Sequence, residues 1–161
     1  MAETLSKNGH KVTLLIWDRQ NDFKMEKEMY NVHKFSLKAP YDKLTALFYL
    51  PFWWIYEFYF LLSHKADVIH ACDFDTLWPA IIAKSINRSK FFYIIYDFYA
   101  DNLPKLPVFI RKTIIFLEKS GISFSDTLFL VDESRYEQVK GAKIKKLVYI
   151  YNSPQDQFPL K

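Results

Sequence analysis

The clearest indication of the fold is the stretch Asp67-Val-Ile-His-Ala-Cys-Asp-Phe-Asp-Thr-Leu-Trp-Pro-Ala-Ile-Ile-Ala-Lys84. Its apolar run, residues 68–71, is typical of a short buried strand, residues 72–76 predict a polar turn, and a helical run follows. Two carboxylates, Asp73 and Asp75, therefore come just after the carboxyl end of a strand. Ligands bind at that edge in open α/β sheets, so the stretch predicts both the class of fold and the place of a site.

The pattern of an apolar strand followed by an acid recurs twice, because residues 91–96 lead into Asp97 and residues 127–131 lead into Asp132. Further strands are predicted over residues 11–18, 30–37 and 147–151, and helices over 2–8, 44–62, 77–85, 108–123 and 133–140. Strands alternate with helices, so we expect an α/β domain with a Rossmann-like parallel sheet flanked by helices, spanning residues 1–151. In the helix over 108–123 we expect Glu118 to face solvent.

Composition narrows the function classes. The 161 residues suffice for one sizeable core, and the net charge of +4 is modest. The chain has three glycines and neither a dinucleotide-binding nor a P-loop motif. It has no basic run interleaved with aromatic residues, so no nucleic-acid-binding module is predicted. Its four histidines lack the spacing of zinc ligands, so no metal site is predicted. The single Cys72 excludes an internal disulfide, and no signal peptide opens the chain, so a cytoplasmic location is expected.

The most apolar segment is Leu44 to Leu62, in which only Thr45 and Glu57 are clearly polar and nine residues are aromatic. Its length approaches the roughly 20 residues of a transmembrane helix. Three interpretations stay open: a crossover helix buried against the sheet, a helix lying at the membrane interface where Trp and Tyr are favoured, and a membrane span.

The acids at the strand ends are the candidate site residues. Carboxylates accept well-directed hydrogen bonds from neutral polyols, so Asp73 and Asp75 are candidates for orienting sugar hydroxyls, with turn formation and helix capping as the structural alternative. Asp97 ends an apolar strand and precedes a loop that carries Tyr99 and a second acid, Asp101. That position suits a base or a hydroxyl-binding group, and a structural role is the alternative.

Several segments resemble the retaining, nucleotide-sugar-dependent glycosyltransferases of family 4, which have the GT-B fold. They match in the family's order and cover nearly the whole chain: Gly9-His-Lys-Val-Thr-Leu-Leu15, Asp67-Val-Ile-His-Ala-Cys-Asp-Phe-Asp-Thr-Leu77, Tyr93-Ile-Ile-Tyr-Asp-Phe-Tyr-Ala-Asp101, Val131-Asp-Glu-Ser-Arg135 and Tyr149-Ile-Tyr-Asn-Ser-Pro-Gln-Asp156. The resemblance implies the amino-terminal, acceptor-binding half of such an enzyme, with its first strand absent. It also implies that a separate Rossmann-like domain would hold the nucleotide-sugar donor, with no cofactor or metal required.

The resemblance also assigns roles within that half. It implies that Asp97 acts near the reacting centre, that the acceptor contacts are Asp73, Asp75, Tyr96, Tyr99 and Asp101, that Asn152 marks the hinge, and that residues 152–161 begin the linker to the donor domain. The expected function is therefore the acceptor side of a retaining glycosyltransferase, inactive by itself, with a sugar or lipid-linked acceptor. The alternative is a non-enzymatic, membrane-associated subunit that contacts the membrane through residues 44–62 and recruits a separate donor-binding chain.

The absent first strand makes a further prediction about the sheet. In the usual strand order the first strand separates the second from the fourth. Without it, the strand over residues 11–18 must either pair directly with the strand over 68–71 or leave both with an unpaired edge.

Overall fold

A computed structural model describes residues 1–23, 29–40, 43–102 and 106–151 of the chain. The chain divides into two compact units, Met1–Phe60 and Leu61–Lys161, and each is described by itself.

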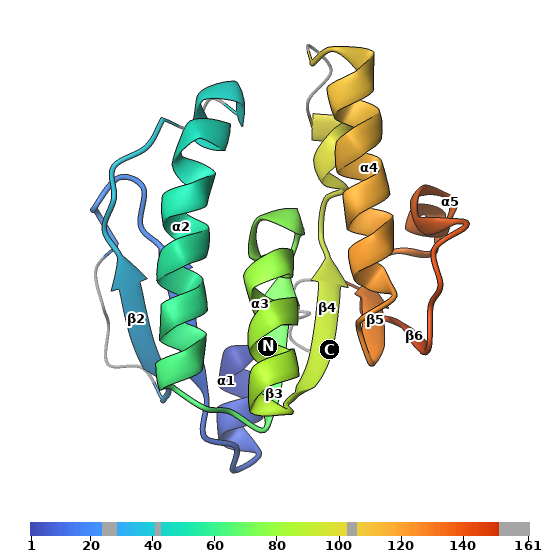
Figure 1. Cartoon of the computed structure of the whole chain (residues 1–161). Helices are drawn as coiled ribbons and strands as arrows, with labels where there is room; N and C mark the ends of the chain where they lie inside the picture. The colour runs from blue at the N-terminus through green and yellow to red at the C-terminus, as the bar shows by residue number, and fades with distance from the viewer. Residues whose placement is uncertain (24–28, 41–42, 103–105, 152–161) are drawn as a thin grey trace, which may run out of the picture. The chain divides into compact units, whose positions relative to one another are not determined.

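The first unit holds a short helix, two parallel strands and most of a long helix (Figure 1). These elements are α1 (Ala2–Lys7), β1 (Thr13–Trp17), β2 (Asn31–Phe35) and α2 (Lys43–Ser63), whose last residues belong to the second unit. Gly9, at φ 84°, follows the end of α1 in the left-handed conformation that glycine adopts without steric cost. Aromatic rings join the strands to α2, since Trp53 stacks on Trp17 and lies against Phe35.

The second unit is a four-stranded, wholly parallel sheet in the order β3-β4-β5-β6. Its elements are β3 (Val68–Cys72), α3 (Phe74–Asn87), β4 (Lys90–Ile95), η1 (Tyr99–Asn102), α4 (Val108–Ile122), β5 (Thr127–Leu130), η2 (Glu133–Arg135), α5 (Tyr136–Val139) and β6 (Leu147–Tyr149). The predicted α/β class with a parallel sheet flanked by helices is confirmed. Because the strands run in one direction, all four carboxyl ends meet at one edge, which is what positions the candidate site.

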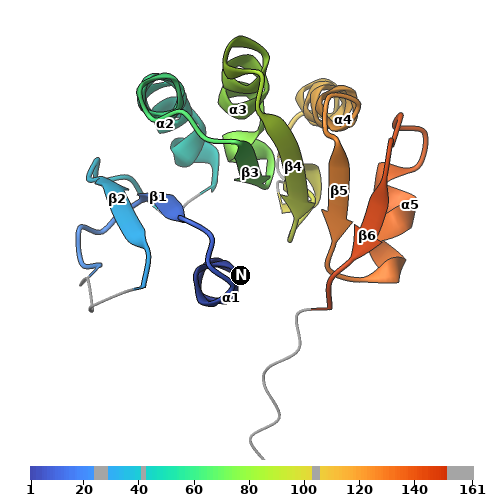
Figure 2. The ribbon, with the colours of Figure 1, turned by 90° about the horizontal axis from the view of Figure 1, so that it is seen from below.

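The core of the second unit lies between the sheet and the helices α3 and α4, which cover the same face of the sheet (Figure 2). Alternate strand residues supply the sheet side of this core, and they are buried: Ile69, Ala71, Phe91, Tyr93, Ile95, Leu128 and Leu130. The helices approach each other closely at Gly121, where an added Cβ would lie 2.5 Å from a methyl group of Leu77. This close contact holds α3, which connects β3 to β4, against α4, which precedes β5.

Two predictions differ from the structure, and one of the two alternatives for the sheet is observed. Asp75 does not cap the helix: α3 begins at Phe74, Asp73 is the residue before it, and Asp75 lies in the first turn. Glu118 does not face solvent but is fully buried, because it lies one turn from both Ile114 and Ile122 on the covered side of α4. Finally, β1 pairs with β2 and β3 with β4 in separate sheets, so among the described residues β3 is an edge strand and the predicted unpaired edge is present.

Candidate functional site

Asp73 joins the carboxyl ends of β3 and β4. Its Oδ1 accepts hydrogen bonds from the backbone N–H groups of Tyr96 (2.8 Å) and Asp97 (3.2 Å), the two residues that follow β4. Its own backbone N–H donates to the carbonyl of Ile94 at 2.9 Å. Its second oxygen, Oδ2, has no partner among the described residues, so one face of this carboxylate is available to a ligand.

The backbone of Asp73 is strained. Its φ of 58° and ψ of 176° lie in a region that is essentially restricted to glycine and that costs about 1–3 kcal/mol for other residues. The surrounding turn maintains this conformation: Thr76 Oγ1 accepts from the N–H of Cys72 at 2.8 Å and donates to the Cys72 carbonyl at 2.7 Å. Strain of this kind concentrates at ligand-binding and catalytic positions, and here it directs the Asp73 carboxylate across the strand ends.

Burial raises the pKa of Asp73 to about 6. The two N–H donors counteract this rise, whereas the nearby carboxylates of Asp75 and Asp97 add to it. Asp73 therefore exchanges its proton close to neutral pH, as a group suited to general acid–base chemistry does.

Asp97 connects the end of β4 to the segment that follows β5. Its Oδ1 accepts a hydrogen bond from Arg135 Nη2 at 3.2 Å, and 62% of its side chain is exposed. On the same segment Asp132 accepts from the N–H of Ser134 at 2.7 Å, and this bond lowers the pKa of Asp132. A carboxylate and a guanidinium thus lie side by side at the sheet edge, open to solvent.

The remaining predicted residues lie around this centre. Tyr96 is exposed, and Tyr99 packs its ring against Phe74 with the centroids 5.2 Å apart. Asp101 accepts from Gln138 Nε2 at 2.6 Å and forms an ion pair with Arg111 at 3.8 Å, so it ties η1 to α5 and α4. The predicted hinge residue, Asn152, lies outside the described residues.

Beneath this edge lies a buried carboxyl group that the sequence pattern did not single out. Glu118 Oε1 accepts a hydrogen bond from the Tyr93 hydroxyl at 3.1 Å, and Glu118 Oε2 has no hydrogen-bond partner in the described structure. Burial, together with the nearby carboxylates of Asp73 and Asp101, raises the pKa of Glu118 to about 8 although the hydrogen bond from Tyr93 lowers it, so Glu118 is protonated at neutral pH. The sequence does carry a signal for the burial of Glu118, because Glu118 lies four residues from both Ile114 and Ile122, which are buried on the same side of α4.

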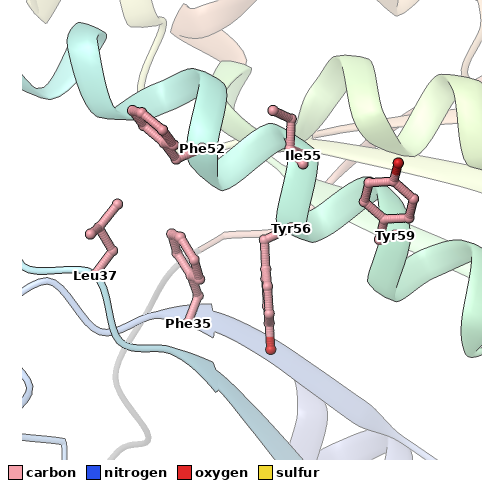
Figure 3. Close-up of a pocket in the computed structure, with 6 residues that line it drawn as sticks. All are labelled: Phe35, Leu37, Phe52, Ile55, Tyr56 and Tyr59. Atoms are coloured by element: carbon pink, nitrogen blue, oxygen red, sulfur yellow. The ribbon is translucent and has the colours of Figure 1, made fainter.

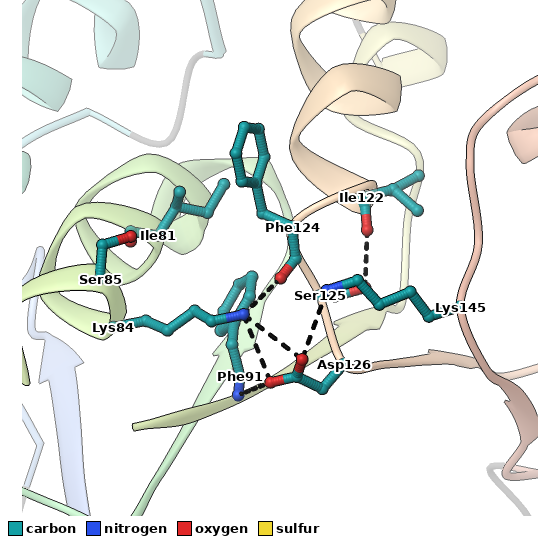
Figure 4. A network of polar contacts seen from close by, with 9 residues as sticks. All are labelled: Ile81, Lys84, Ser85, Phe91, Ile122, Phe124, Ser125, Asp126 and Lys145. Atoms are coloured by element: carbon teal, nitrogen blue, oxygen red, sulfur yellow. Dashed lines mark hydrogen bonds and ion pairs between the residues drawn. The ribbon is translucent and has the colours of Figure 1, made fainter. Parts of the chain in front are cut away.

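The opposite, amino edge of the sheet carries a different network (Figure 4). Asp126, which precedes β5, accepts from the N–H of Phe91 at 2.8 Å and pairs with Lys84 at 3.3 Å and Lys145 at 3.4 Å. Lys84 also donates to the Phe124 carbonyl at 2.7 Å. Partial burial raises the pKa of Asp126, but the Phe91 N–H and Lys84 outweigh it and hold the pKa below its ordinary value. Both oxygens of Asp126 are in use, so this network joins elements together and leaves neither carboxylate oxygen without a partner.

The carboxyl edge, by contrast, brings hydrogen-bond acceptors and hydrogen-bond donors together. The unpartnered oxygen of Asp73 and the exposed carboxylate of Asp97 accept hydrogen bonds, while the Arg135 guanidinium and the Tyr96 hydroxyl donate them. Each sugar hydroxyl both donates and accepts, so this combination suits a polyol. Within the described ranges no three Asp, Glu, His or Cys side chains gather as metal ligands would.

Comparisons with models of known protein families, with curated proteins and with solved structures found no match to this chain.

Proposed function

We propose that the second unit binds a polyhydroxylated acceptor at the carboxyl edge of its sheet and is the acceptor side of a retaining glycosyltransferase. The observation that carries the proposal is the linkage of three successive strand ends by the side chains of Asp73, Asp97 and Arg135. These side chains are held in place by the parallel sheet, and each has hydrogen-bonding capacity left for a ligand.

Each residue has a distinct role in this proposal. Asp97 accepts the hydrogen bond of the hydroxyl group that receives the sugar, and Arg135 fixes the orientation of that carboxylate. Asp73 and Tyr96 contact neighbouring hydroxyls. Tyr99 supports the site through its contact with Phe74, and Asp75 and Asp101 flank it.

The donor in this proposal is a nucleotide sugar held by a separate domain or polypeptide. Glycosyl transfer depends on holding donor and acceptor in register, a positioning effect that can supply roughly 7–11 kcal/mol of the barrier. The acceptor side alone therefore binds but does not transfer, and no resident cofactor or metal is needed.

A transfer assay tests this proposal. The chain is co-expressed with a candidate donor-binding polypeptide, and the pair is assayed with nucleotide sugars for transfer to acceptors, with the chain alone as the reference. We expect transfer by the pair, and its loss in Asp97→Ala. Asp67→Ala is the matched control, because Asp67 is an exposed aspartate before β3, at the opposite edge. Unchanged transfer in Asp97→Ala would remove Asp97 from the site.

A second candidate function is favoured by the surface of α2, which exposes Phe48, Phe52, Ile55 and Tyr59 by more than half. No helix in the described part of the chain combines the length and apolarity that a bilayer crossing requires. The chain would then be a subunit that contacts the membrane surface through α2 and recruits a donor-binding chain, whether or not it takes part in catalysis. Co-sedimentation with vesicles tests this contact.

A further inference from the structure

A groove in the first unit lies between α2 and the strand β2 (Figure 3). Its volume is about 450 Å³, within the range of ligand-binding cavities of roughly 300–1,000 Å³. It is lined by six apolar or aromatic residues: Phe35, Leu37, Phe52, Ile55, Tyr56 and Tyr59. None of them carries a carboxylate, an ammonium, a guanidinium or an amide, so the groove suits a hydrocarbon rather than a polar ligand.

The floor of the groove is a set of packed aromatic rings. Tyr56 stacks on Phe35 with the centroids 4.7 Å apart, and Phe35 lies 5.8 Å from Trp53. Trp17 stacks on Trp53 at 5.9 Å and donates from its indole N–H to the Leu37 carbonyl at 2.7 Å. These contacts fix the floor before any ligand arrives, which reduces the entropy lost on binding.

The groove opens onto an apolar stripe along α2. Phe48, Phe52, Ile55 and Tyr59 are spaced by four, three and four residues and therefore lie on one side of the helix. Their exposed fractions are 78%, 59%, 57% and 67%. At 1.5 Å per residue the stripe is about 17 Å long. Soluble surfaces rarely expose this much contiguous apolar area unless it meets a partner or a membrane.

The charges around the stripe indicate which of these it meets. Between residues 43 and 66 the only carboxylate is Glu57, which is buried. The exposed Lys38 follows Leu37 of the groove, within the same unit. An aromatic surface on α2 beside the exposed Lys38, with the one carboxylate of the helix, Glu57, buried, complements an anionic lipid surface.

We infer that the stripe lies in the membrane interface and that the groove takes one hydrocarbon chain of a membrane phospholipid. This inference deepens the membrane contact proposed for α2 and is independent of the sugar site in the second unit. The lipid chain lies along Phe52, Ile55 and Tyr59 and rests on the rings of Phe35 and Tyr56.

Fluorescence quenching by brominated phospholipids tests the groove, because bromine quenches an indole only at short range and the Trp53 ring lies 5.8 Å from the Phe35 ring that lines the groove. The full chain carrying Trp54→Phe and Trp78→Phe keeps Trp17 and Trp53, the stacked pair behind Phe35. It is mixed with vesicles of phosphatidylcholine and phosphatidylglycerol that have bromine on the acyl chains, and separately with the same vesicles without bromine. We expect quenching in the brominated vesicles only.

A filled groove separates chain uptake from simple surface adsorption. Leu37→Phe with Ile55→Phe occupies the space while keeping the surface apolar, so we expect vesicle co-sedimentation to persist and quenching to be lost. Phe109→Ser with Phe116→Ser on α4 is the matched control, since these rings are 71% and 69% exposed and lie in the other unit. We expect the control to be quenched like the parent. Near-ultraviolet circular dichroism establishes that each variant is folded.

Several outcomes would overturn the inference. They are an absence of vesicle binding, quenching that the filled groove retains, and quenching that the α4 control loses. A dimer that forms without vesicles and is lost in the filled variant would show instead that the groove holds a second copy of the chain. None of these results bears on the carboxyl edge of the sheet, which is titrated with sugars in the absence of lipid.

Discussion

The two edges of the four-stranded sheet carry the same kinds of charged group and use them differently. At the amino edge, Asp126 engages both carboxylate oxygens with Lys84, Lys145 and the N–H of Phe91. At the carboxyl edge, the carboxylate of Asp97 has one polar partner among the described residues, Arg135, and most of the side chain is exposed. An acid beside a basic residue therefore does not by itself mark a site; the number of hydrogen-bonding positions left over does.

Backbone geometry separates the edges as well. At the carboxyl edge Asp73 combines φ 58° with ψ 176°, whereas at the amino edge Arg88, which precedes β4, has φ 58° and ψ 32°, the left-handed conformation common after a helix end. Strain costs stability, and a network that saturates its partners supplies stability. The comparison assigns the fold's polar stabilisation to one edge and its binding capacity to the other, and the following variants test it.

The largest effect is expected from Glu118, buried below the carboxyl edge. Its pKa of about 8 exceeds the ordinary 4.5, so the folded state binds this proton more tightly than the unfolded state. The stabilisation is complete below about pH 4.5 and is lost as pH rises toward 8. Relative to Glu118→Gln, the wild type should lose about 3 kcal/mol of its free energy of unfolding between about pH 4.5 and 7.

Urea unfolding at a series of pH values measures this difference. Glu137→Gln is the control, because Glu137 is exposed on α5 and forms a surface ion pair with Lys140. Parallel pH profiles for the wild type and Glu118→Gln would contradict the assignment of a buried, protonated Glu118.

The amino-edge network comes next. Asp126→Asn weakens the charge-assisted hydrogen bonds from the N–H of Phe91 and from Lys84, and bonds of this kind contribute roughly 1.5–3 kcal/mol each. We expect a loss of about 2 kcal/mol in the free energy of unfolding, measured by urea denaturation at neutral pH. A variant as stable as the wild type would mean that the network does not hold the edge together.

Two substitutions at Asp73 separate its hydrogen bonds from its strain. Asp73→Ala and Asp73→Gly both remove the carboxylate that accepts from Tyr96 and Asp97. Only glycine relieves the strain at φ 58°. The glycine variant should therefore be more stable than the alanine variant by about 1 kcal/mol in thermal unfolding. If alanine proves equal or better, the backbone at Asp73 is not strained.

The smallest effect on stability is expected at Asp97. Asp97→Asn removes a solvent-exposed ion pair, and such pairs contribute less than about 1 kcal/mol. We expect the free energy of unfolding to change by less than about 0.5 kcal/mol, in contrast to Asp126→Asn. A loss comparable to that of Asp126→Asn would mean that both edges are structural.

The sequence carried enough information to predict the strands and the acids that follow them. Runs such as Phe91 to Ile95 are short, apolar and bounded by turn residues. Such runs are typical of the buried strands of a parallel sheet, so they can be recognised from the local sequence alone. The order of strands and helices then places Asp73 and Asp97 at one edge, and the structure confirms that they are adjacent.

Other features depend on contacts that no local pattern specifies. Arg135 reaches Asp97 across 38 residues of sequence, and nothing near either residue predicts that pair. The rarity of buried charged residues predicts that Glu118 faces solvent, whereas its spacing from Ile114 and Ile122 places it on the covered side of α4. The strain at Asp73 arises from the link between two strand ends, so it too is a property of the tertiary structure.

An amide NMR titration of the chain with free hexoses and their methyl glycosides tests most directly whether the carboxyl edge is the binding edge. We predict saturable shifts at Asp73, Tyr96, Asp97 and Arg135, loss of these shifts in Asp97→Asn, and their retention in Asp67→Asn. Shifts centred on Phe91 and Asp126, or no saturable shift at either edge, would contradict the account.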